Sequence, residues 1–143
     1  MKRLFVLAAA LTAAAGVSVA SVSASSPRSG VLHATKECSE YTGLAGSFCT
    51  FTSSNLKALA VGSKIVYVSA AGATALNTDV FLEAGPGNKA FGHCILVFAD
   101  LPGECTFRGG TGQFTGFHAH VVVSTLDGIN WRWEGSYSFS PRD

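Results

Sequence analysis

The clearest pattern in the chain is an alternation of large apolar and polar side chains over residues 130–139. The odd positions carry Trp131, Trp133, Gly135, Tyr137 and Phe139, and the even positions carry polar or charged residues. A period of two is typical of a β-strand with one buried and one solvated face. We therefore expect a strand whose aromatic row faces a core, with Gly135 leaving space for a crossing side chain or a ligand.

Seven earlier runs alternate in the same way or are rich in β-branched residues. They cover residues 31–35, 47–53, 64–69, 77–84, 89–99, 104–108 and 117–125. Turn signals separate several of them, most clearly Asp127-Gly128, which is typical of a hairpin. Only residues 55–62 suit a helical turn. Short strands joined by sequential hairpins predict an all-β fold, and we expect an eight-stranded antiparallel up-and-down barrel.

A glycine-rich reversal lies between two of these runs, over residues 105–117. Four glycines fall at positions 109, 110, 112 and 116. Glycine reaches positive φ without a steric clash, so such a cluster marks a tight turn. A phosphate-binding loop would need a helix and usually a lysine after the glycines. Residues 117–125 are strand-like instead, which favours a structural turn.

The N-terminal residues have the pattern of a cleavable signal peptide over residues 1–24. Lys2 and Arg3 precede an apolar run, and small residues allow cleavage after Ala20 or Ala24. The run is short for a membrane span. We expect a flexible leader over 25–30 and one barrel domain over 31–143. The protein should then be secreted, to the periplasm or outside the cell, with no membrane anchor after cleavage.

The charge of the mature chain excludes two classes of partner. Without Lys2 and Arg3, eight basic and nine acidic side chains remain, which gives a net charge of −1. The basic residues form no cluster along the sequence. Binding to nucleic acid or to an anionic membrane requires such a cluster, so we expect neither partner.

Four cysteines in an exported chain predict two disulfides. Cys38 and Cys49 are 11 residues apart, as are Cys94 and Cys105, and Thr-Phe follows both Cys49 and Cys105. The sequence allows three connectivities. This faint repeat favours Cys38–Cys49 and Cys94–Cys105. The spacing of zinc-binding cysteine pairs is absent.

His118 and His120 would lie on one face of a strand, where a pair of imidazoles can bind a metal. His93 is a candidate third ligand. The alternate residues, from Phe117 to Val123, are apolar and would face the core. That arrangement puts both histidines on the solvated face, so we predict no metal and no cofactor.

Asp79 and Glu83 would also share a strand face, about 13 Å apart at 3.3 Å per residue. That separation exceeds what either glycosidase mechanism uses. A GxSxG motif is absent, and two disulfides leave no free thiol as a nucleophile. The sequence therefore assigns no catalytic residue.

The glycine-rich segment also resembles a known family. Gly109-Gly110-Thr111-Gly112-Gln113-Phe114, followed by Gly116 and Ala119, is similar to the glycine signature of allene oxide cyclase and dirigent barrels. Cys105-Thr-Phe before it and Trp131-Arg-Trp-Glu-Gly-Ser-Tyr-Ser-Phe after it resemble small secreted bacterial members of this superfamily. The similarity is sharp over 105–139 and loose over 59–104.

The resemblance implies an eight-stranded antiparallel barrel, often a homotrimer, whose lumen can hold an apolar substrate. The family's cyclases close a ring on an unsaturated fatty epoxide or a natural-product chain, and dirigent relatives steer the coupling of phenoxy radicals. The residues that hold the epoxide in the cyclases, and the acidic residues of dirigent proteins, have no matching motif here. The resemblance therefore supports the fold rather than an activity.

Three hypotheses for function follow. The first is a secreted barrel that binds a small apolar molecule in its lumen, since eight strands can just enclose one. Its lining candidates are Trp131, Trp133, Tyr137 and Phe117. The second is an allene-oxide-cyclase-like or dirigent-like enzyme that acts on an apolar substrate. The third is an extracellular structural or interaction module with a filled barrel.

Overall fold

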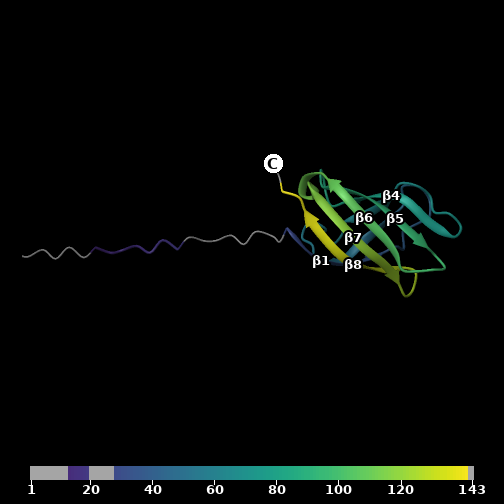
Figure 1. The fold of residues 1–143 in the computed structure, drawn as a ribbon, viewed down its shortest axis with the longest axis horizontal. Helices are drawn as coiled ribbons and strands as arrows, with labels where there is room; N and C mark the ends of the chain where they lie inside the picture. Colours follow the sequence, from purple (N-terminus) through teal and green to yellow (C-terminus); the bar gives the residue numbers. More distant parts are fainter. Residues whose placement is uncertain (1–12, 20–27, 142–143) are drawn as a thin grey trace, which may run out of the picture.

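A computed structural model of the chain describes residues 13–19 and 28–141. Eight strands form one closed antiparallel barrel in which each strand pairs with the next and β8 pairs with β1 (Figure 1). The strands are β1 (Ser29–Glu37), β2 (Phe48–Ser54), β3 (Lys64–Tyr67), β4 (Ala75–Glu83), β5 (Lys89–Val97), β6 (Gly103–Gly110), β7 (Phe117–Thr125) and β8 (Asn130–Phe139). The predicted fold class is confirmed.

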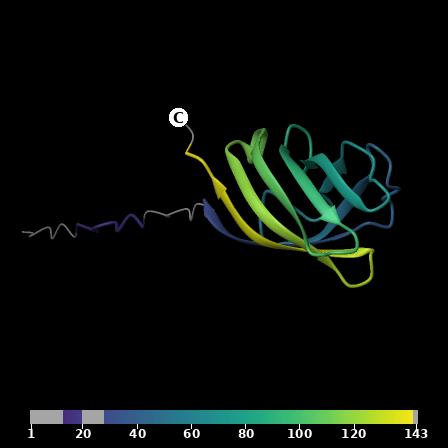
Figure 2. The same cartoon turned by 45° about the vertical axis from the view of Figure 1, so that its right-hand side comes forward.

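The strands with the strictest alternation begin and end where the sequence predicts, as β7 and β8 show. The prediction for the first strand was too short. β1 runs from Ser29 to Glu37 and pairs with β8 along its whole length (Figure 2). Ser29 and Gly30 therefore belong to the barrel and not to a leader. The other predicted segments at the N-terminus, 1–24 and 25–27, lie mostly outside the described residues.

The segment 55–62 forms no helix; it is a turn-rich connection between β2 and β3. Leu56 and Leu59 on this connection are buried and pack into the core. Within the described ranges, no helix has the length and apolar character that crossing a membrane requires.

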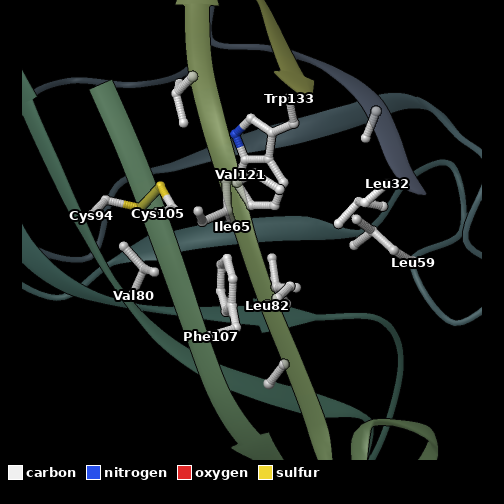
Figure 3. Close-up of a cluster of buried hydrophobic side chains, with 14 of the residues drawn as sticks. Leu32, Leu59, Ile65, Val80, Leu82, Cys94, Cys105, Phe107, Val121 and Trp133 are labelled. Atoms are coloured by element: carbon white, nitrogen blue, oxygen red, sulfur yellow. A yellow bond between two sulfur atoms is a disulfide. The ribbon is translucent and has the colours of Figure 1, made fainter. Parts of the chain in front are cut away.

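The middle of the barrel is filled by side chains from alternate positions of the strands (Figure 3). The indole of Trp133 is fully buried and meets the ring of Phe51 edge-on, with centroids 4.9 Å apart. The ring of Phe107 lies 5.5 Å from the same indole. The predicted aromatic row of β8 thus faces the core.

One end of the barrel is closed by the glycine-rich segment. This segment contains an unpredicted one-turn 3-10 helix, Gly112–Phe114, and Phe114 is fully buried against Phe117 at 5.1 Å between ring centroids. The helix rests on the β4–β5 turn, where the backbone N–H of Gln113 donates to Asn88 Oδ1 at 2.9 Å. Gly112 has a positive φ of 58°, and a Cβ there would overlap Asn88 Oδ1, so the turn requires glycine at this position.

Both predicted disulfides are present. Cys94 on β5 and Cys105 on β6 lie directly opposite each other (Figure 3), and Cys38 just beyond β1 joins Cys49 on β2. The cysteine residues of the described part therefore all pair. The first disulfide closes the β1–β2 connection at the barrel end opposite the 3-10 helix.

Candidate functional site

The barrel end opposite the 3-10 helix contains a cavity of about 220 Å³. It is more enclosed than the grooves on the outer face of the barrel. Its walls are mainly aromatic and aliphatic, with the Cys38–Cys49 disulfide on one side. The principal lining side chains are Lys36, Tyr41, Tyr67, Leu76, Leu96 and Trp131.

Lys36 enters the cavity because it continues the inward-facing row of β1. Leu32, Ala34 and Lys36 alternate with outward residues, and Lys36 is only 3% exposed. The pairing of β1 with β2 shifts register between Thr35 and Lys36, so a bulge lies beside the lysine. The sequence prediction ended this strand at Thr35 and left Lys36 outside it, which is wrong.

Aromatic rings surround the ammonium group of Lys36. Its Nζ donates to Tyr67 Oη at 2.5 Å and lies 5.2 Å from the centroid of the Tyr67 ring. The rings of Trp133 and Trp131 lie at 5.4 and 5.9 Å. Contacts of a cation with aromatic rings offset only part of the cost of removing the charged amine from water. Burial therefore lowers the pKa of Lys36 from its ordinary 10.5 to about 7.

Two tyrosines complete the polar part of the cavity. The rings of Tyr41 and Tyr67 meet edge-on with centroids 5.0 Å apart. The Tyr41 hydroxyl is buried without a hydrogen-bond partner among the described residues. Burial raises the pKa of both phenols, so both hydroxyls stay protonated near neutral pH.

The Cys38–Cys49 disulfide holds Tyr41 at the cavity. The backbone N–H of Tyr41 donates to the Cys38 carbonyl at 3.1 Å, which ties the tyrosine to the disulfide. On the other side, the Tyr67 hydroxyl lies 3.7 Å from Cys49 Sγ. The covalent link thus positions both phenols as well as joining two strands.

The four lining residues predicted from sequence fall at different levels of the barrel. Trp131 borders the cavity, and its Nε1–H donates to the Gly128 carbonyl at 3.2 Å. Trp133 lies deeper, in the core beneath the Lys36 amine. Phe117 and Tyr137 lie toward the closed end, where Phe117 packs on Phe114. Of these four residues, Trp131 lines the cavity.

Gly135 leaves no space for a ligand or a crossing side chain. A Cβ at this position would overlap the carbonyl oxygen of His120 and lie 2.8 Å from Val121 Cα. The backbone of β7 therefore occupies the gap in the aromatic row. The expectation of an opening at Gly135 is wrong.

The histidines lie on the outer face of the barrel, away from the cavity. His118 and His120 are exposed on β7, and His120 Nε2 lies 3.0 Å from Glu104 Oε2. His93 on β5 contacts Asp79 at 2.8 Å and is separated from His120 by Thr106 on β6. No group of three or more metal-ligating side chains occurs within the described part of the chain.

An open groove of about 560 Å³ crosses the outer face of β4, β5 and β6. Its lining includes Asp79, Phe81, Phe91, His93 and Arg108. Asp79 and Glu83 are both exposed on the outer face of β4. Neither carboxylate reaches the cavity inside the barrel.

Scans against protein-family models, curated proteins and solved structures found no match for the chain. The resemblance to allene oxide cyclase and dirigent barrels therefore stays a prediction from residues 105–139. The candidate site itself was missed, since sequence reasoning assigned no role to Lys36 or Tyr41. Extending the alternation of Leu32 and Ala34 by two residues would have put Lys36 inside the barrel.

Proposed function

We propose that this protein is an extracytoplasmic barrel that binds a small, mainly apolar molecule in the cavity at its open end. The observation that carries the proposal is a hollow of about 220 Å³ in a barrel whose middle and opposite end are filled. Ligand sites are concave and mostly apolar, with a few polar groups that fix orientation. The walls near Leu76, Leu96 and Trp131, with Lys36 as the polar group, have this character.

The volume sets the size of the ligand. An apolar protein cavity of about 150 Å³ holds benzene, so this one suits a molecule with one ring or a short chain. Larger ligands occupy pockets of roughly 300–1,000 Å³. A fatty epoxide of the kind that the family's cyclases close would exceed this space. The size therefore favours a small aromatic or short aliphatic ligand.

Binding has more support than an allene-oxide-cyclase-like or dirigent-like enzyme. An enzyme of that kind would be favoured by a carboxylate or an amide in the cavity. The side chains that line it include neither. The expected location, secreted to the periplasm or outside the cell, is supported by two disulfides, which persist in oxidising compartments.

The proposal is tested by titrating the barrel with benzyl alcohol in a calorimeter. We expect a dissociation constant of about 1 mM, equivalent to about 4 kcal/mol, which is reasonable for so few atoms. Leu96→Phe should weaken binding at least tenfold, because it fills the cavity from β5. Ile95→Phe is the matched control, since Ile95 is the preceding residue and faces outward, 42% exposed. Equal binding by the two variants would contradict the site, and no binding by the wild type would contradict the function.

A second candidate function, an interaction module, is favoured by the outer face of β5. Phe91, Ile95 and Val97 are 42–48% exposed there. Such apolar surface is typical of contacts between subunits or with other proteins. We propose that this face would form the subunit contact if the chain assembles as the homotrimer that the family resemblance implies. Sedimentation of the wild type and of Phe91→Ser tests it: a trimer that the substitution converts to a monomer supports the contact.

A further inference from the structure

The Lys36 amine lies inside the barrel without an acidic partner. Tyr67 Oη, at 2.5 Å, is its one hydrogen-bond partner among the residues described. The side chains that line the cavity include no aspartate or glutamate. Glu37, the next residue, points out of the barrel and binds the backbone N–H of Ser39. Burying an ammonium group without a counter-ion costs free energy. A negatively charged group inside the cavity would offset that cost.

The two other polar side chains of the cavity are tyrosines, whose hydroxyls can also donate. The Tyr41 hydroxyl is buried with no partner in the described part of the chain, and its ring packs on Tyr67. The Tyr67 oxygen already accepts from Lys36, and its O–H lies toward Cys49 Sγ at 3.7 Å. Lys36 Nζ and the Tyr41 O–H can therefore both donate to an occupant that supplies acceptors. Ionised acceptors make the strongest such bonds.

We propose that the ligand of this cavity is a small aromatic or short-chain carboxylic acid, bound as its carboxylate by Lys36 and Tyr41. One carboxylate oxygen would accept from the Lys36 ammonium, and the other would accept from the Tyr41 hydroxyl. The apolar part would lie against Leu76, Leu96 and Trp131. This inference rests on the proposed binding function and adds the chemical class of the ligand.

The charge pairing predicts that a proton is taken up on binding. Burial lowers the pKa of Lys36 to about 7 in the empty cavity, and an adjacent carboxylate raises it again. The titratable groups that face the amine are Tyr67 and Tyr41, and burial raises the pKa of both. At pH 8 neither phenol titrates. Proton uptake at this pH therefore reports on Lys36.

The test compares benzoate with benzyl alcohol, its uncharged relative, by calorimetry at pH 8 in buffers of different ionisation enthalpy. We expect benzoate to bind at least tenfold more tightly, with an uptake of roughly half a proton or more. Lys36→Met should abolish both the preference and the uptake. Lys64→Met is the matched control, because Lys64 is exposed on β3 with its Nζ over the Phe48 ring, and it should change neither.

Tyr41→Phe keeps the test decisive if Lys36→Met fails to fold. It removes one oxygen atom and should weaken benzoate several-fold while the proton uptake persists. Benzyl alcohol binding as tightly as benzoate, or benzoate binding without proton uptake, would overturn the inference and leave the proposed function standing. Failure of both probes to bind would overturn the proposed function as well.

Discussion

The buried amine of Lys36 makes the stability of the barrel depend on pH. Its pKa is about 7 in the folded protein and has the ordinary value of 10.5 in the unfolded chain. Between these values the unfolded chain binds one more proton than the barrel. The free energy of unfolding therefore rises with pH across this window, by about 1.4 kcal/mol per pH unit.

Lys36→Met should remove this dependence and stabilise the protein at pH 7. Methionine has a similar length and carries no charge that burial would oppose. Urea unfolding at pH 7 and at pH 9 should give the wild type about 2 kcal/mol more stability at the higher pH, and the variant almost none. The nearby phenols of Tyr41 and Tyr67 hardly titrate below pH 9, because burial raises their pKa. Equal slopes in wild type and variant would contradict a buried, deprotonated lysine.

The sequence could not reveal this residue by its type, because lysines are almost never fully buried. Its position depends on the length of β1, which exceeds the predicted strand at both ends. It also depends on the bulge between Thr35 and Lys36. By contrast, Trp131 was predicted as a lining residue from the period of β8 alone. The period of two therefore predicts whether a side chain faces into or out of the barrel, but not how far along the barrel axis it lies.

Among the strands, β7 and β8 approach each other closely at Gly135. Gly135 pairs with Val121, and a Cβ there would overlap the backbone at His120. Close approach of two backbones is a recognised reason for glycine within a strand. This contact holds β7 and β8 against each other, and their pairing is among the longest in the C-terminal half of the chain.

Gly135→Ala should destabilise the barrel by about 1–3 kcal/mol, because the methyl group forces β7 and β8 apart. Ser136→Ala is the control on the next residue of β8, whose side chain is exposed. Thermal or urea unfolding measures both variants. A Gly135→Ala variant as stable as Ser136→Ala would mean that the strands separate at no cost.

Most of the strand pattern was predictable because, in a barrel surrounded by water, apolar inward-facing and polar outward-facing side chains alternate along each strand. The equal spacing of the cysteines favoured Cys38–Cys49 and Cys94–Cys105 among three connectivities, and these two disulfides are present. The 3-10 helix at Gly112–Phe114 was not predictable, since a single turn has no periodicity to detect. Its effect is large nonetheless, because Phe114 closes one end of the barrel.

At the scale of the whole molecule, the two ends of the barrel differ. One end is closed by Phe114 and Phe117, and the other is hollow beside Lys36. The filled middle around Trp133 separates them. The ligand that we propose would therefore enter and leave by the open end, beside the disulfide that holds Tyr41. The sequence predicted the barrel but could not predict which part of it is hollow, because that depends on how side chains from eight strands pack together.

Locating benzoate on the protein by NMR tests the proposed cavity site most directly. Intermolecular NOEs are predicted from the benzoate ring protons to the methyl groups of Leu76 and Leu96, with a shift of the Trp131 indole N–H resonance. These three side chains line the cavity. NOEs to Phe81 and Phe91 in the outer groove, with no contact to the leucines, would contradict binding inside the barrel.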